Sequence, residues 1–329
     1  MKQKHNTWLA NRRRIISRPV ALILARCERA LLDKTAPLRY PPVFVLGVPR
    51  SGTTLLYQVL VHSFEVAYFC NAAEEHSHYP ATVTRVYRSR IRKYRTDFAS
   101  NYGVTKRRHG PSEGIGIWSR WFPPDTYADE HCLSASGADE GRRTVAAVST
   151  LVKSPFVNKD PRHCGRVRAL NALFPGCLFV YMRRDAVANA ASILNVRRKR
   201  AARGEGDVTT WISVKPKEYA SISRVGHISQ ICGQVYYCAR NALDDLTAVA
   251  ADRHLIVSYE ELCAEPRREV DRIAAFSQTY GVPLRQRLSP PVSFPPPPPV
   301  PVPEADREAI RAQFAELHHR SGFGSSTQA

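Results

Sequence analysis

The sequence predicts an α/β fold in which helices flank a parallel sheet and a phosphate-binding loop follows the first strand. Short apolar runs, bounded by Pro, Gly or polar residues, occur at 43–46, 148–152, 177–182 and 254–258. Such runs are typical of strands that are buried on both faces. Segments with a helical pattern separate them, and this alternation predicts a parallel sheet.

The first half of the chain holds the loop and most of the irregular sequence. Gly47 to Gly52 is predicted to be a loop, and a helix is expected at 53–62. Val66 to Phe69 is a candidate for a second strand. Residues 79–145 are rich in Arg, Tyr and Gly, and we expect them to form helices and loops over the sheet.

The second half predicts helices between and after the strands, at 162–174, 186–200, 226–250, 266–280 and 304–318. The proline-rich segment 289–304 is expected to adopt polyproline II conformation, since it can be neither helix nor central strand. It is either a rigid spacer, which we favour, or a ligand of a partner domain. The expected divisions are a basic N-terminal helix, a main domain, the proline-rich segment, and a last helix with its tail, at 1–40, 41–288, 289–304 and 305–329.

The N-terminal segment 8–32 has the pattern of a basic amphipathic helix. Arginines fill most of its surface, and apolar side chains recur at spacings of three or four, at Ile16, Val20, Ile23, Cys27 and Leu31. Such a helix either packs on the domain, which we favour, or lies on an anionic membrane surface.

Composition leaves several classes of partner open. Of the 329 residues, 43% are hydrophobic and 23% are charged, which is ordinary for a chain with a buried core. The 48 Lys and Arg outnumber the 29 Asp and Glu, for a net charge of +19. This charge indicates an anionic partner, such as nucleic acid, anionic lipid, a phosphorylated cofactor or an acidic polysaccharide.

The cysteines and apolar runs bear on the compartment. No C-x-x-C pair occurs, so reduced thiols are favoured over zinc ligands or disulfides for Cys27, Cys70, Cys132, Cys164, Cys177, Cys232, Cys238 and Cys263. No apolar run has the length of a membrane span. The run at 19–25 is followed by Arg26, Cys27 and Glu28 rather than by a small-residue cleavage site. We therefore expect a cytoplasmic protein.

The segment Gly47-Val-Pro-Arg-Ser-Gly-Thr-Thr54 lies between a predicted strand and a predicted helix. In this context the main-chain N–H groups of a loop and a helix start converge on phosphate. The two glycines have the spacing of the nucleoside-triphosphatase loop, but Thr53 replaces its lysine and Arg50 lies inside the loop. This change argues against ATP or GTP hydrolysis and suits a cofactor with one 5′ phosphosulfate.

A second strand-to-helix junction carries a compatible motif. Arg184 lies at the end of the predicted strand 177–182, and Ser192 follows eight residues later. Because eight residues are a little over two helical turns, both can face the crevice at the carboxyl edge of the sheet. Arginine offers a planar fork to phosphate, and serine adds a hydroxyl donor.

Together these motifs resemble the sulfotransferase superfamily that uses 3′-phosphoadenosine-5′-phosphosulfate, or PAPS. P-R-S-G-T-T resembles its 5′-phosphosulfate loop, and R-D-x₆-S its 3′-phosphate motif. Leu151 to Pro155 resembles a strand-end lysine motif, and Ile256 to Leu262 resembles a Y-E-[DE]-L segment. The resemblance runs from about 41 to 284 and is nearest to the bacterial-type and tyrosylprotein-like branch. It implies a sulfotransferase-like, P-loop-type parallel sheet flanked by helices.

The resemblance also implies a role for each matching residue. The cofactor-binding residues would be Arg50, Ser51, Gly52, Thr53, Thr54, Arg184, Ser192 and Tyr259. Arg184 and Ser192 would hold the 3′ phosphate, and Tyr259 would lie near the adenine. Lys153, with Arg50, would stabilise the charge that develops on the leaving phosphate. The product would be the bisphosphate PAP, and no metal is required.

The resemblance does not settle the general base. Cytosolic sulfotransferases have a histidine where this chain has Pro155, and the glutamate of tyrosylprotein sulfotransferases aligns with Asn71. The candidates left open are Glu74, Glu75, His76 and Glu113. We favour Glu113, because the segment 110–118 resembles a G-P-x-E-x₄-W stretch of bacterial relatives.

The acceptor is the least defined part of the prediction. Basic clusters at 85–95, 106–108 and 197–200 are either solvated helix faces or a surface for a polyanionic or lipid-linked acceptor. Trp118 and Trp121 either stack on a sugar or pack in the core. We predict a carbohydrate or glycolipid acceptor at the inner membrane face. The alternatives are a P-loop kinase or nucleotidase, and a nucleic-acid-binding protein, for which no readout motif is present.

Overall fold

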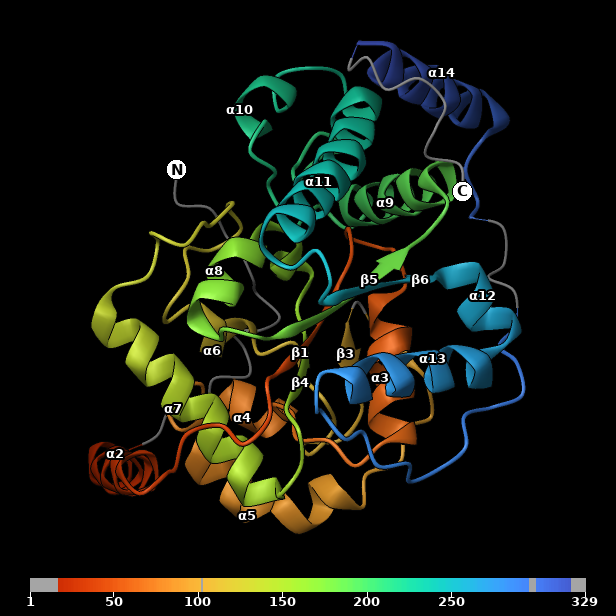
Figure 1. Cartoon of the computed structure of the whole chain (residues 1–329). Helices are drawn as coiled ribbons and strands as arrows, with labels where there is room; N and C mark the ends of the chain where they lie inside the picture. Colours follow the sequence, from red (N-terminus) through yellow and green to blue (C-terminus); the bar gives the residue numbers. More distant parts are fainter. Residues whose placement is uncertain (1–16, 102, 296–299, 321–329) are drawn as a thin grey trace.

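A four-stranded parallel sheet forms the centre of the molecule (Figure 1). The computed structural model describes residues 17–101, 103–295 and 300–320. The strand order is β4 (Val157–Lys159), β1 (Val43–Leu46), β5 (Leu178–Arg183), β6 (His254–Ser258), and every neighbouring pair is parallel. The predicted α/β fold is confirmed.

The register aligns the carboxyl ends of the strands at one edge. Val45 of β1 lies opposite Lys159 of β4 and opposite Val180 of β5. Arg183, the last residue of β5, lies opposite Ser258, the last residue of β6. The segments that follow the four strands therefore leave the sheet side by side, which is where ligands bind in open parallel sheets.

Helices cover both faces of the sheet. On one face, α3 (Thr53–Ser63) packs against β1 and β4, and α13 (Pro266–Thr279) packs against α3 and β6. The opposite face is covered by the short 3₁₀ helix η1 (Pro161–Gly165), α8 (Val167–Leu173), α9 (Ala186–Ala201) and α11 (His227–Val249). The last helix, α14 (Glu304–Arg320), packs on α9 and α11.

The remaining elements are short or lie beside the sheet. They are α2 (Arg18–Asp33), α4 (Asn71–Glu75), α5 (Pro80–Arg92), α6 (Ile115–Trp118), α7 (Ala135–Val152), α10 (Tyr219–Ile222), α12 (Tyr259–Ala264) and the two-stranded pair of β2 (Ser100–Asn101) with β3 (Val104–Thr105). Thus residues 79–145 do form helices and loops, as predicted.

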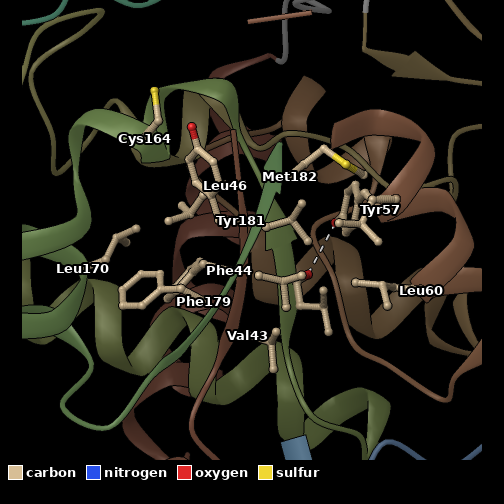
Figure 2. Close-up of a cluster of buried hydrophobic side chains, with 14 of the residues drawn as sticks. Val43, Phe44, Leu46, Tyr57, Leu60, Cys164, Leu170, Phe179, Tyr181 and Met182 are labelled. Carbon is tan, nitrogen blue, oxygen red and sulfur yellow. Dashed lines mark hydrogen bonds between the residues drawn. The ribbon is translucent and has the colours of Figure 1, made fainter. Parts of the chain in front are cut away.

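The core holds the strands in place through large apolar side chains, part of which Figure 2 draws. Phe44 of β1 is fully buried, and its ring lies 5.7 Å from that of Phe174 and 5.9 Å from that of Trp118. Tyr57 of α3 donates its hydroxyl to the carbonyl of Val157 at 3.4 Å. Six of the eight cysteines are buried and all eight are free thiols, as predicted.

The prediction of a strand at 148–152 is wrong. These residues are the last turn and a half of α7, and Val145, Val148 and Val152 are buried at helical spacing. The true strand, β4, begins only at Val157. It has three residues, two of them polar, so it lacks the apolar run on which the prediction relied.

The other expected elements are present with small changes. The helices predicted at 53–62, 186–200, 226–250, 266–280 and 304–318 are confirmed within a few residues. The helix predicted at 162–174 is divided into η1 and α8. Val66 to Phe69 is not a regular strand, but Ala67 forms one parallel bridge with Phe156 at the side of β4.

The N-terminal helix α2 packs on α5 and α7. Glu28 is buried and accepts hydrogen bonds from the main-chain N–H groups of Ala81 (3.0 Å) and Thr82 (2.7 Å), which begin α5. The predicted apolar face is not the packed one, because Val20 and Ile23 are exposed. The part of the predicted helix at 8–16 lies outside the described residues. Within the described ranges, no helix is both long and apolar enough to span a bilayer.

Candidate active site

The loop from Gly47 to Gly52 joins β1 to α3 in a tight, strained path. A Cβ on Gly47 would lie 2.6 Å from Ser51 Oγ and 2.9 Å from the carbonyl oxygen of Met182, so only glycine fits there. Arg50 has a left-handed backbone, with φ of 71°. Strain of this kind is common where a backbone is shaped around a ligand.

The loop and the start of α3 have the properties of an anion site. Gly52 is the N-cap of α3, no side chain caps the helix, and its first turn holds no acidic residue. The uncapped N–H groups and the positive end of the helix dipole are thus available to an anion. Ser51 is fully buried, and its hydroxyl has no hydrogen-bond partner among the described residues. A phosphate-bearing group therefore fits this loop.

The second motif meets the loop directly. Arg50 Nε donates to Ser192 Oγ at 3.3 Å, and Arg184 Nη1 donates to the carbonyl of Arg50 at 2.9 Å. Asp185 sets this geometry by capping α9, because its carboxylate accepts the N–H of Ala188 at 2.7 Å. Arg184 Nε is buried and has no hydrogen-bond partner within the described ranges.

Tyr259 completes the cluster from the end of β6. Its ring lies 4.6 Å below the guanidinium of Arg184 and presses on Gly52, where any Cβ would overlap the ring. Burial raises the pKa of Tyr259 to about 12, so its phenol is neutral at physiological pH. The ring thus forms a cation–π contact with Arg184 beside the phosphate loop.

The structure thus brings the predicted cofactor-binding residues together. The contacts link Arg50, Ser192, Arg184, Tyr259 and Gly52 in one group at the carboxyl edge of the sheet. Ser51 lies in the same loop, and Thr53 and Thr54 form the first turn of α3.

Lys153 does not lie in this group. It caps the C-terminus of α7, before β4 begins, and so belongs to the edge of the sheet opposite the loop. The lysine at a strand end is instead Lys159, the last residue of β4, which neighbours Val45 of β1. Asp160 and Pro161, a typical helix start, follow Lys159 directly and were a usable signal for this junction.

Glu113 pairs with Lys159. The carboxylate contacts Lys159 Nζ, and the two side chains are 14% and 2% exposed. Gly103, with φ of 90°, lies against this carboxylate, and any Cβ on it would overlap Glu113 Oε1. Asn158 adds a hydrogen bond from Nδ2 to the Glu113 carbonyl at 3.4 Å. Sequence reasoning named Glu113 but missed its partner.

Glu74 lies close to the same group. Its Oε1 accepts the N–H of Gly116 at 2.7 Å, and its Oε2 is buried without a hydrogen-bond partner in the described structure. Burial raises the pKa of Glu74 to about 7, with a further contribution from the negative charges of Asp160 and Glu113. The pKa of this carboxyl therefore lies well above its usual value of 4.5.

The other candidates for the base have different positions. Glu75 pairs with Arg108 at 2.7 Å. His76 is the C-cap of α4. Asn71 donates from Nδ2 to the carbonyls of Thr105 and Arg107, both at 2.9 Å, and so braces the segment that carries Gly103.

A buried polar network supports the end of β4. Asn158 Oδ1 accepts from Trp118 Nε1 at 2.8 Å and lies 2.9 Å from His163 Nε2. Burial lowers the pKa of His163 to about 3, so this imidazole is neutral. Burial disfavours the charge of Asp160, but Arg162 and Arg166 outweigh it and hold its pKa below the usual value.

Trp118 and Trp121 are core residues, 0% and 6% exposed, and do not present a stacking surface for sugar.

Comparison with known proteins agrees with this geometry. The model of the sulfotransferase family matches residues 41–280. The chain belongs to the sulfotransferase family. Among solved structures, this sulfotransferase is similar to sulfotransferase STF9 from Mycobacterium avium, with 17% identity, a TM-score of 0.53, and coverage of 91% of this chain and 80% of that one. STF1 from Mycobacterium tuberculosis H37Rv gives 17% identity, a TM-score of 0.49, and coverage of 91% and 83%. Among curated proteins no sequence matches.

Among the residues of this chain that the structure describes, no group of three or more His, Cys, Asp or Glu side chains is arranged to hold a metal ion.

Proposed function

We propose that the chain transfers a sulfuryl group from PAPS to a hydroxyl of an acceptor. The observation that carries this proposal is the contact between the two phosphate motifs. Arg50 of the first motif bonds to Ser192 of the second, and Arg184 bonds to the carbonyl of Arg50. Two anion-binding elements held together in this way suit a nucleotide with separate 5′ and 3′ groups.

The residues around the loop supply binding and orientation. The loop N–H groups, Ser51 and the start of α3 would hold the 5′ phosphosulfate. Arg184 and Ser192 would hold the 3′ phosphate, and the ring of Tyr259 would lie against the adenine. This arrangement places the fixed positive charges before the reaction begins, which is how such sites lower a barrier.

The chemical step needs a cation at the leaving oxygen and a base at the acceptor. When bound, PAPS supplies the sulfuryl group. Lys159, together with Arg50, would stabilise the negative charge that grows on the bridging oxygen. Glu113 would accept the proton of the acceptor hydroxyl. We favour Glu113 over Glu74, because the free oxygen of Glu74 is buried whereas the Glu113 side chain is partly exposed beside Lys159.

For the acceptor we propose a carbohydrate or glycolipid. Support comes from the net charge of +19 and from the arginines exposed on α5, such as Arg85, Arg88 and Arg90. A cytoplasmic location with α2 at the inner membrane face stays a prediction. Sulfation of small phenols or peptides, with none of a panel of glycans and glycolipids, would overturn this acceptor class.

Calorimetric titration with adenosine 3′,5′-bisphosphate, beside Mg-ATP, tests the donor. We expect tight binding of the bisphosphate, weak binding of ATP, and loss of bisphosphate binding in Arg184→Ala. Stronger binding of ATP would favour the kinase or nucleotidase alternative. Binding of neither, with steeply salt-dependent binding of DNA, would favour the nucleic-acid alternative.

A further inference from the structure

A cavity lies at the edge of the sheet opposite the phosphate loop. It has a volume of about 280 Å³ and is enclosed by the end of α3, the end of α5, the segment before β4 and the segment after α13. Its apolar wall includes Val61, Phe64, Val66, Tyr68, Ile91 and Val152. This cavity shares no residue with the group around Arg50.

Four cations line this cavity against one carboxylate. The cations are Arg92, Lys153, Arg285 and Arg287, and the carboxylate is Glu65. None of the four cations forms an ion pair with any residue that the structure describes. Arg92, Lys153 and Arg285 are exposed, whereas Arg287 is half-buried, so three of the four cations are accessible from solvent.

The two other arginines are fixed by neutral groups. Arg287 donates to the carbonyls of Val61 (2.8 Å), Arg92 (2.7 Å) and Tyr94 (2.7 Å). Arg92 Nε donates to the carbonyl of Val152 at 2.8 Å. Carbonyls satisfy these donors but do not cancel their charge, so the positive potential of the cavity remains. Burial lowers the pKa of Arg287, and the charge of Arg95 lowers it further, against opposing effects of Tyr68 and Glu65.

We propose that this cavity is a second anion site, which binds the phosphate or sulfate group of a small ester. Lys153 and Arg285 contact the anion, and Arg92 and Arg287, which carbonyls hold in place, provide fixed positive charge beside it. Charge-assisted bonds to phosphate or sulfate are the strong hydrogen bonds of proteins. The volume is near the lower limit of small-molecule sites, so it suits a compact ligand. This inference does not depend on the proposed function.

Titration of the full chain with inorganic phosphate and with inorganic sulfate, at constant ionic strength, tests the site. The variants are Lys153→Asn, which suits the left-handed backbone of Lys153, and Arg285→Ala. Each removes one charged contact, so we expect affinity for the second site to fall about tenfold or more. Lys153→Arg, which keeps the charge, should retain binding.

Two further variants show whether anion binding takes place at the second site or at the phosphate loop. Arg50→Ala alters the phosphate loop and should leave the second site intact. Arg224→Ala removes an exposed arginine between α10 and α11 and should change nothing. Thermal unfolding of each variant checks that it is folded. If Lys153→Asn and Arg285→Ala are folded and bind both anions as the wild type does, the proposal is wrong, whatever the result for the loop.

Discussion

Lys159 and Glu113 form an ion pair that joins the end of β4 to the segment before α6. Both side chains are mostly buried, so breaking the pair by removing one partner leaves a charge without compensation. The pair lies beside β1, whose loop carries Arg50. The proposed chemistry therefore depends on these two residues, and substitution of each one tests a different role.

Lys159→Ala should lower kcat of sulfuryl transfer by about 10²–10³, the usual effect of losing one group that stabilises transition-state charge. Lys153→Asn should cause a much smaller loss, because Lys153 lies at the other edge of the sheet. Steady-state kinetics of both variants with the same acceptor measures which kcat loss is larger. Equal losses, or a larger loss for Lys153, would contradict the assignment of Lys159.

Glu113→Gln should lower kcat by about 10²–10⁴ if Glu113 is the general base. Affinity for adenosine 3′,5′-bisphosphate should change little, because Glu113 pairs with Lys159 of β4, whereas the proposed phosphate ligands are Arg50, Arg184 and Ser192. Glu74→Gln is the matched variant. A large kcat loss in Glu74→Gln with little in Glu113→Gln would assign the base to Glu74 instead.

Gly103→Ala should lower kcat by displacing Glu113, since its Cβ would overlap Glu113 Oε1. Gly204→Ala is the control, because Gly204 also has a positive φ (71°) but no atom lies within 4 Å of its Cβ. Both variants carry the backbone strain of a left-handed alanine, about 1–2 kcal/mol. Similar kcat values in the two variants would show that Gly103 has no role in placing Glu113.

Gly52→Ala should abolish binding of the bisphosphate, because a Cβ would displace the ring of Tyr259. Tyr259→Ala should weaken binding by itself, and Gly52→Ala should then add a smaller loss. A double-mutant cycle by calorimetry measures this coupling. Additive losses would indicate that the close approach of Gly52 and Tyr259 does not matter for binding.

Glu74 should make the protein less stable as pH rises from about 4.5 to 7. Its pKa is about 7 when folded against a usual value of 4.5, so in this window the folded state holds a proton that the unfolded state has lost. The contribution is on the order of 3 kcal/mol. In denaturant unfolding, Glu74→Gln should lack this loss of stability with rising pH. Glu308→Gln, at an exposed position of α14, is the control and should show the same pH dependence as the wild type.

The sequence was sufficient for three of the four strands, β1, β5 and β6, and for the phosphate loop, because these depend on local patterns. Strand, glycine loop and helix follow one another at Gly47–Thr54, and Arg184 precedes its helix directly, so short spacings define the geometry. Lys159 was missed for a physical reason. Its strand is held by pairing with β1 and not by its own apolar content, which only the tertiary structure reveals.

The roles of Glu113 and Glu74 could not be predicted from the sequence. Both carboxylates were recognised as candidates, but their roles depend on burial and on partners far away in the chain. The contact of Glu113 with Lys159 spans 46 residues, and that of Glu74 with Gly116 spans 42. No local pattern reports such distances.

The hydrogen bonds of Glu28 mean that the folding unit is larger than the region of family similarity. The similarity begins at residue 41 and ends at 280, yet Glu28 of α2 caps α5, and α14 lies on α9 and α11. A fragment trimmed to 41–280 would uncover the apolar surface on which Ile310 and Phe314 of α14 pack, and would leave the first N–H groups of α5 without their acceptor. Expression designs should therefore keep α2 and α14.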